Sequence, residues 1–162
     1  MIRPQILGGV FAGLAMFAVT LAWQAQAGSK LGKSDTKVKA TATATKAGAD
    51  GTQTVTITLD IEKGWHLYAN PVNHNNDFLD ANQTTVKIAA KDKLGDVKVN
   101  YPAGKTKIDK KEKYNIYEGT TKIVASVVRV MGDTSPLQIT VEVSACDDKV
   151  CLAPGKIKLT VP

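Results

Sequence analysis

The clearest structural signal in the chain is the stretch Leu137-Gln138-Ile139-Thr140-Val141-Glu142-Val143-Ser144-Ala145. Apolar and polar side chains alternate through all of it. A period of two places every apolar side chain on one face of a β-strand. The stretch therefore predicts a strand with one buried face in an antiparallel sheet.

The same alternation recurs elsewhere in the chain, most clearly from 54 to 61 and from 156 to 161. Turn signals containing glycine or proline separate these segments, and no segment shows the 3.6-residue spacing of an amphipathic helix. The weaker strand candidates are 37–45, 84–89, 96–101 and 121–130, the last an almost continuous apolar run typical of a central strand.

Seven or eight short strands in about 130 residues predict an all-β fold, an immunoglobulin-like antiparallel β-sandwich. A closed barrel is the alternative, which periodicity does not distinguish from a sandwich. The length of 162 residues with 43% hydrophobic side chains is sufficient for a single domain with its own core. Two cysteines are too few for a disulfide-dense miniprotein or a four-thiolate zinc site.

The N-terminal segment has the three parts of a secretory signal. Arg3 supplies the basic start, residues 6–23 are apolar, and Ala25-Gln26-Ala27 predicts cleavage after Ala27. An uncleaved anchor is the alternative, because 18 apolar residues are the lower edge of a membrane span. We therefore expect a signal peptide at 1–27, a polar leader at 28–36 and a single domain at 37–162. This domain is expected to be exported to the periplasm and to be monomeric. It would contact a membrane only if the signal is uncleaved.

The formal charge of +6 does not indicate nucleic-acid binding. The lysines are scattered, few aromatic residues lie among them to stack on bases, and export removes the chain from nucleic acid. One lysine-rich run is either a solvated loop or a docking surface for an acidic redox partner: Lys105, Lys107, Lys110, Lys111 and Lys113.

The two cysteines flank a short polar loop, Cys146-Asp147-Asp148-Lys149-Val150-Cys151. Four intervening residues allow the sulfurs to meet across a hairpin-like connection, and exported thiols tend to be oxidised. Such a disulfide is either a structural bond or a redox-active pair. Closing so short a loop stabilises the fold by only about 2 kcal/mol, which favours the redox interpretation.

The local sequence also predicts the environment of Cys146. Ala145 is the last inward residue of its strand, so we expect Cys146 on the opposite face or at the rim, where it is accessible. Asp147 and Asp148 are expected to raise the thiol pKa, and Lys149 to lower it.

Four motifs in register give the chain a resemblance to a known family. The motifs are Gly64-Trp65-His66-Leu67-Tyr68, Tyr101-Pro102, Ile116-Tyr117-Glu118-Gly119 and Ala145-Cys146-Asp147-Asp148-x-x-Cys151-Leu152-x-Pro154. With these motifs, the chain resembles the N-terminal periplasmic domain of the thiol:disulfide interchange protein DsbD over residues 37–162.

The resemblance implies an immunoglobulin-like sandwich that shuttles electrons by thiol–disulfide exchange. Cys146 and Cys151 match the redox pair, with Cys151 expected to contact the target, and His66 and Tyr68 match aromatic positions beside it. Residues 108–114 match a cap loop, with Tyr114 in place of its aromatic residue.

The resemblance also implies the partners. A thioredoxin-like domain or a DsbD-like membrane protein would be the electron donor, periplasmic disulfide-containing proteins would be the targets, and cytochrome c biogenesis is an associated process. Because the chain ends at Pro162, after its last strand, we expect the donor to be a separate protein. The competing class is a non-catalytic exported sandwich, a binding or structural module with an inert disulfide.

The remaining candidate residues indicate no other chemistry. His66 and His74 are the only histidines and match no zinc spacing, and Met131 is the only methionine beyond the signal, so we expect neither a metal nor a cofactor. His74 is expected to be a solvated loop residue. The chain has no Gly-x-Ser-x-Gly motif of a hydrolase.

Overall fold

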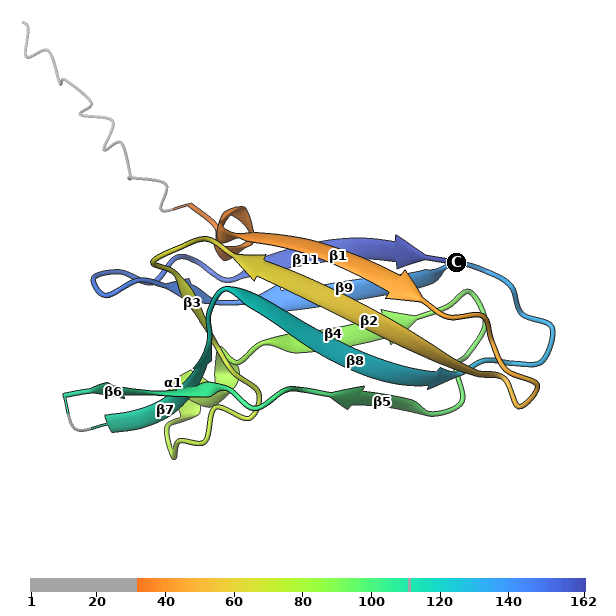
Figure 1. The fold of residues 1–162 in the computed structure, drawn as a ribbon, viewed down its shortest axis with the longest axis horizontal. Helices are drawn as coiled ribbons and strands as arrows, with labels where there is room; N and C mark the ends of the chain where they lie inside the picture. Colours follow the sequence, from red (N-terminus) through yellow and green to blue (C-terminus); the bar gives the residue numbers. More distant parts are fainter. Residues whose placement is uncertain (1–31, 111) are drawn as a thin grey trace, which may run out of the picture.

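A computed structural model describes residues 32–110 and 112–162 of the chain. The predicted signal peptide, 1–27, lies outside the described residues. The elements, in chain order, are η1 (Ser34–Lys37), β1 (Val38–Ala44), β2 (Thr52–Ile61), β3 (His66–Tyr68), α1 (Asp77–Ala81), β4 (Thr85–Ala89), β5 (Val97–Asn100), β6 (Lys105–Asp109), β7 (Glu112–Tyr117), β8 (Thr120–Val128), β9 (Leu137–Val143), β10 (Ala145–Cys146) and β11 (Gly155–Val161) (Figure 1).

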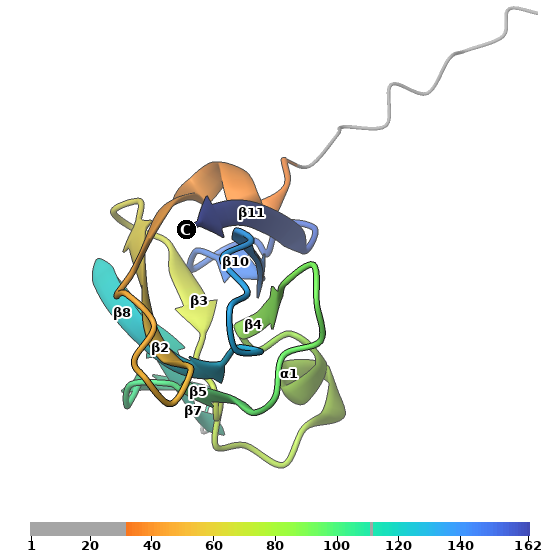
Figure 2. The same cartoon turned by 90° about the vertical axis from the view of Figure 1, so that its right-hand side faces the viewer.

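Two antiparallel sheets form the body of a β-sandwich. One has the strand order β1-β2-β8-β5 and the other β11-β9-β4. The end-on view in Figure 2 shows β2 and β8 on the opposite side of the molecule from β11 and β4. The all-β, immunoglobulin-like sandwich predicted from the sequence is therefore confirmed, and the described strands form separate sheets rather than one closed barrel.

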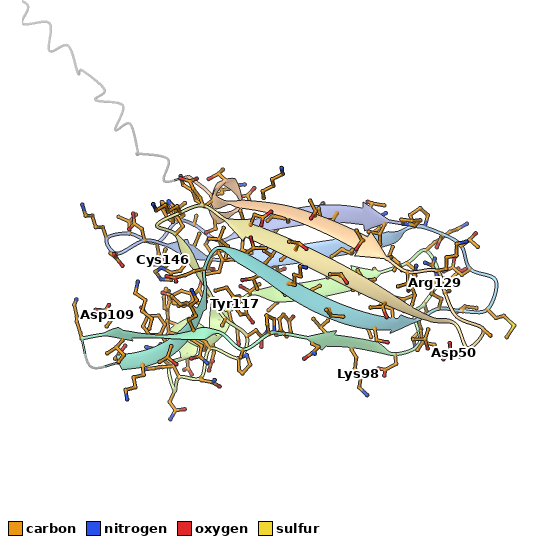
Figure 3. All side chains as sticks on the ribbon, in the orientation of Figure 1. Asp50, Lys98, Asp109, Tyr117, Arg129 and Cys146 are labelled. Atoms are coloured by element: carbon orange, nitrogen blue, oxygen red, sulfur yellow. A yellow bond between two sulfur atoms is a disulfide. The ribbon has the colours of Figure 1, made fainter. Side chains whose placement is uncertain are left out.

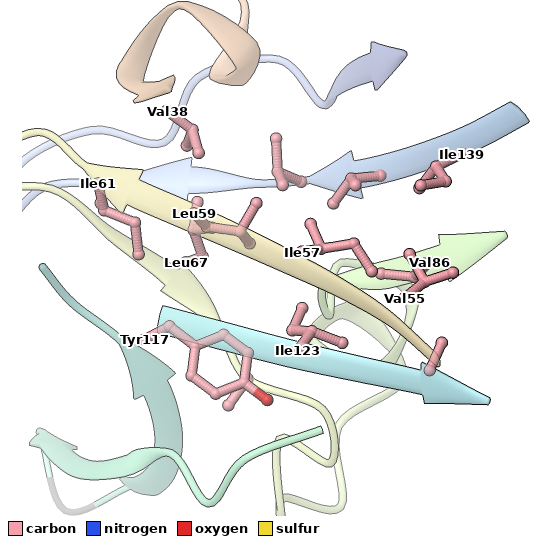
Figure 4. Packing of buried hydrophobic residues seen from close by; sticks show 14 of the residues in the cluster. Val38, Val55, Ile57, Leu59, Ile61, Leu67, Val86, Tyr117, Ile123 and Ile139 are labelled. Carbon is pink, nitrogen blue, oxygen red and sulfur yellow. The ribbon is translucent and has the colours of Figure 1, made fainter. Parts of the chain in front are cut away.

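The main hydrophobic core lies between these two sheets (Figure 4). In the β2–β8 ladder, Ile57 is paired with Ile123 and Val55 with Ala125, and all four side chains are fully buried. The residues between them in sequence face outward, as the period of two predicts. Truncating a core isoleucine such as Ile57 to alanine is expected to cost about 2–5 kcal/mol of stability.

A third sheet, with the order β10-β3-β7-β6, projects from one end of the sandwich (Figure 1). Its strands bury side chains on both faces. Leu67, Tyr117 and Ala145 belong to the main core. The opposite face carries a second, smaller cluster, which consists of Tyr68, Val72, Leu79, Tyr114, Ile116 and Cys146.

Three strands of this third sheet, β3, β6 and β7, were not predicted from the sequence. β3 has only three residues, all buried, so it shows no alternation. β6 is largely exposed and charged, which is typical of a loop sequence, and β7 begins with two exposed charged residues before its buried half. The five-residue helix α1 is too short to show a helical stripe. The strands that the alternation predicted lie in the other two sheets, together with β10.

The last residues of the polar leader pack against the domain. The Ser34 hydroxyl is buried, accepts a hydrogen bond from the Ala145 backbone N–H at 2.8 Å and donates one to the Ala153 carbonyl at 2.9 Å. A Cβ at Gly155 would collide with the backbone nitrogen of Asp35, so this close approach needs glycine. Helix η1 thereby holds the chain on both sides of the cysteine loop.

None of the helices in 32–110 and 112–162 is long and apolar enough to cross a membrane.

Candidate active site

The two cysteines close a β-hairpin at one end of the molecule (Figure 3). They form a disulfide and are paired across an antiparallel bridge, with their Cα atoms 4.0 Å apart. The backbone hydrogen bonds lie on either side of the pair, from Asp147 N–H to the Val150 carbonyl and from Leu152 N–H to the Ala145 carbonyl, each 2.9 Å. Side chains at such a non-hydrogen-bonded pair approach most closely, so the backbone itself brings the sulfurs together.

The two cysteines differ in their exposure to solvent. Cys146 is 2% exposed, whereas Cys151 is exposed. The expectation that Cys146 would be accessible is wrong. Its side chain does point away from Ala145 and the main core, but that face is covered by the second cluster, where Tyr68 and Tyr114 pack beside it. An incoming protein thiol can therefore reach Cys151 but not Cys146.

The loop between the cysteines is held in shape by Asp147. Its Oδ1 atom accepts hydrogen bonds from the backbone N–H groups of Lys149 and Val150, both at 2.7 Å. These two bonds are the main reason why the pKa of Asp147 lies below its ordinary value. The carboxylate thus serves as an acceptor that closes the turn.

Tyr68 places its hydroxyl group beside both sulfurs. The oxygen lies 3.5 Å from Cys146 Sγ and 3.8 Å from Cys151 Sγ. Disulfide sulfurs carry no hydrogen, so the hydroxyl is the donor. Burial raises the pKa of Tyr68, and the neighbouring Tyr114 and Asp109 raise it further, so the proton is retained. The Tyr114 ring packs on that of Tyr68, with centroids 5.8 Å apart.

His66 is the cross-strand partner of Cys146 in the β3–β10 ladder. Its side chain is buried and meets the Tyr68 ring edge-on, with centroids 6.3 Å apart. Burial lowers the pKa of His66, and the charge of Lys107 lowers it further. The imidazole is therefore neutral at neutral pH.

A cavity of about 500 Å³ opens beside the pair. It is lined by His66, Tyr68 and both cysteines, and by residues of the cysteine loop and of the β6–β7 hairpin. The hairpin contributes the residues 107–110 and Tyr114. Of the segment 108–114, where the family resemblance places a cap loop, residues 108–110 and Tyr114 thus lie beside the cysteines.

An ion pair joins the hairpin to the cysteine loop. Lys107 Nζ lies 2.9 Å from Asp148 Oδ1, with the lysine side chain 23% exposed and the aspartate 90% exposed. Hydrogen bonding and charge from Lys107 hold the pKa of Asp148 below its ordinary value. The sequence placed Lys107 only within a lysine-rich run, because nothing local shows that a residue 41 positions away lies beside the cysteine loop.

Comparison with known proteins now identifies the family. The family model described as "Thiol:disulfide interchange protein DsbD, N-terminal" matches residues 34–161. The chain belongs to this family. No curated protein is matched by the whole-sequence search.

Three solved structures are similar to the chain at 16% sequence identity. The N-terminal periplasmic domain of ScsB from Proteus mirabilis has a TM-score of 0.54, and the match covers 76% of this chain and 44% of that one. The reduced DsbD N-terminal domain of Neisseria meningitidis has a TM-score of 0.48, with coverage of 80% and 88%. The complex between the DsbD and PilB N-terminal domains of N. meningitidis has a TM-score of 0.47, with coverage of 74% and 80%.

The chain therefore spans less than half the length of the ScsB structure, and at this identity the likeness concerns the fold alone. In this member of the DsbD N-terminal family, the structure brings together the two cysteines and the three side chains expected beside them. Cys146, Cys151, His66, Tyr68 and Tyr114 line one cavity.

His74 lies away from this group and differs from its expected environment. Its side chain is only 18% exposed, and its Nε2 atom lies 4.0 Å from Glu112 Oε2. His74 thus lies in a loop, as expected, but its side chain is half-buried rather than fully solvated. Among residues 32–110 and 112–162, no three His, Cys, Asp or Glu side chains are placed to hold a metal ion.

Proposed function

We propose that this chain is an exported thiol–disulfide exchange protein. It passes reducing equivalents from a thioredoxin-like or membrane-bound donor to periplasmic protein disulfides through Cys146 and Cys151. The observation that carries the proposal is the asymmetry of the disulfide, with one exposed sulfur and one buried sulfur beside a hydroxyl donor. Membership of the DsbD N-terminal family supports it.

The first half-reaction begins at the exposed sulfur. A donor thiolate attacks Cys151 Sγ and forms a mixed disulfide, the Cys146–Cys151 bond breaks, and its electron pair leaves on Cys146 Sγ. The Tyr68 hydroxyl, 3.5 Å from that sulfur, donates a hydrogen bond to the new thiolate. The donor's second thiolate then attacks its own sulfur in the mixed disulfide, which releases Cys151 as a thiolate and leaves the donor oxidised.

The second half-reaction repeats these steps on a target. The Cys151 thiolate attacks the target disulfide and forms a mixed disulfide, and one target sulfur leaves as a thiolate. Cys146 then attacks Cys151 Sγ, which restores the intramolecular disulfide and releases the target in reduced form. Two electrons enter and two leave in each cycle.

Equilibration of the purified protein with glutathione buffers tests the proposal. A shuttle requires a reduction potential within the range of redox proteins, above about −300 mV. A value well below that limit identifies an inert structural bond and supports the non-catalytic sandwich instead.

Trapping in periplasmic extracts tests the roles of the two sulfurs. The Cys146→Ser variant keeps the exposed thiol and is expected to accumulate mixed disulfides with partner proteins. The Cys151→Ser variant keeps only the buried thiol and is expected to accumulate few. The variant lacking both cysteines is the matched control, and absence of trapped partners from both single variants contradicts the proposal.

A further inference from the structure

We infer that Lys107 is a positioning residue for this exchange: its ammonium group stabilises the thiolate that forms on Cys146 when Cys151 is attacked. The inference rests on the proposed function and assigns a role to a residue of the β6 strand. The proposed role belongs to the positive charge of Lys107 and is separate from the ion pair that this residue forms with Asp148.

Lys107 lies in the wall of the cavity that contains both sulfurs. Its ammonium nitrogen lies 2.9 Å from Oδ1 of Asp148, in the middle of the cysteine loop. Its charge acts on the neighbouring cavity residues, since it lowers the pKa of His66, the cross-strand partner of Cys146. The same charge opposes the rise in the pKa of Tyr114 that burial causes.

The titratable groups that line the cavity around Cys146 come from β3, β7, the β6 strand with its turn, and the cysteine loop. β3 contributes His66 and Tyr68, which are neutral, and β7 contributes Tyr114. The charged groups that line the cavity are three cations and three anions: Lys107, Lys110, Lys149, Asp109, Asp147 and Asp148.

Of the three lysines that line the cavity, Lys107 has the least exposed side chain. Its side chain is 23% exposed, whereas Lys110 and Lys149 are exposed and screened by water and salt. Charges in a partly buried position interact more strongly than the same charges in water. Without Lys107, a Cys146 thiolate would share its cavity with three carboxylates and two solvated lysines.

The exchange step creates that thiolate without a proton. The partner's sulfur loses its negative charge as it bonds to Cys151, and the electron pair of the broken disulfide moves to Cys146. A negative charge therefore appears on a side chain that is 2% exposed. Such a charge needs a hydrogen-bond donor and a nearby cation, since burial disfavours it. Tyr68 supplies the donor, and Lys107 supplies the cation.

Asp148 allows the role of the charge to be separated from that of the ion pair. If Lys107 acts only by linking the β6–β7 hairpin to the cysteine loop, Lys107→Gln and Asp148→Asn break the same ion pair. The two variants then change the pKa of the Cys146 thiol in the same direction. If Lys107 acts through its charge, the two variants have opposite effects, because one removes a positive charge from the cavity and the other a negative charge.

The first measurement is the pKa of the Cys146 thiol, followed by thiolate absorbance in proteins that also carry Cys151→Ala. We expect Lys107→Gln to raise this pKa by about one. We expect Asp148→Asn to lower it, and Lys107→Arg to retain the wild-type value. Lys110→Gln, an exposed charge on the same hairpin, is the matched control and is expected to have a smaller effect.

The second measurement is the rate at which dithiothreitol reduces the disulfide, in proteins with both cysteines. A leaving thiol whose pKa is raised by one leaves roughly threefold more slowly, so Lys107→Gln is expected to slow reduction by about that factor. Lys107→Arg is expected to restore the rate. Circular dichroism of each variant shows whether the fold is retained.

The outcomes separate the two proposals. Equal slowing by Lys107→Gln and Asp148→Asn, or an unchanged Cys146 pKa in Lys107→Gln, overturns the inference about Lys107 while leaving the exchange function intact. A wild-type disulfide that glutathione and dithiothreitol both fail to reduce overturns the proposed function itself.

Discussion

His66 and Cys146 are direct cross-strand partners, and both side chains are almost fully buried, at 4% and 2% exposure. An imidazole in this position has to give up its solvation before it can carry a charge, and burial accordingly lowers its pKa. Protonation of His66 therefore makes the stability of this end of the molecule depend on pH.

Replacing His66 with glutamine is expected to weaken the pH dependence of stability. The folded pKa lies below the unfolded value of about 6.5, so between the two values the unfolded chain binds more protons. His66 therefore contributes a loss of stability that begins as the pH falls through about 6.5 and levels off below the folded pKa. Urea unfolding between about pH 5 and pH 7.5 measures this slope. An unchanged slope in His66→Gln would show that protonation of another group causes it.

Replacing Tyr68 with phenylalanine is expected to make the disulfide harder to reduce. The change removes the hydroxyl beside both sulfurs but keeps the ring that packs on Tyr114. A hydrogen bond to a charged group contributes about 1.5–3 kcal/mol, so the pKa of the Cys146 thiol should rise by about one to two. Thiolate absorbance checks the pKa, and glutathione equilibration checks the potential. Tyr114→Phe is the matched control, and an equal effect of both variants would contradict the role of the Tyr68 hydroxyl.

The single-cysteine variants are expected to differ in their reaction with alkylating agents. Under native conditions, Cys151 in Cys146→Ser should react with iodoacetamide at least about tenfold faster than Cys146 in Cys151→Ser, because the Cys146 side chain needs a local opening to be reached. Mass spectrometry measures both rates. In denaturant the two rates should converge, and equal native rates would show that the second cluster does not cover Cys146.

Replacing Gly104 with alanine is expected to destabilise the hairpin that borders the cavity. A Cβ at this position would lie 2.6 Å from Ala69 Cβ and 2.9 Å from Asn115 Cβ, so the β6–β7 hairpin would have to shift. Overpacking of this kind costs about 1–3 kcal/mol, which denaturant unfolding measures. Gly32→Ala, where the nearest atom is 3.7 Å away, is the control and should leave stability unchanged. Equal stability of both variants would show that the hairpin adapts without cost.

The strands of the sandwich could be predicted because alternation is a local property. The period of two from Leu137 to Ala145 depends only on which residues are apolar, and the structure places β9 and the start of β10 there. The pairing of Cys146 with Cys151 is similarly local, since a four-residue loop limits how far apart the two can lie. The positions of His66, Tyr68 and Tyr114 beside the pair came from the family resemblance rather than from any local signal.

The exposure of each sulfur and the charges around it depend on tertiary structure. Cys146 is buried because Tyr68, Val72 and Leu79, from segments more than 60 residues earlier, cover its face of the third sheet. Lys107 reaches Asp148 because the β6–β7 hairpin folds beside the cysteine loop. The sequence alone therefore determined the strands of the two main sheets, the disulfide spacing and the candidate residues. Only the tertiary structure decided that Cys151 is exposed while Cys146 is buried, and that Lys107 lies beside the cysteine loop. The reason is that burial and electrostatic interactions depend on distance through space.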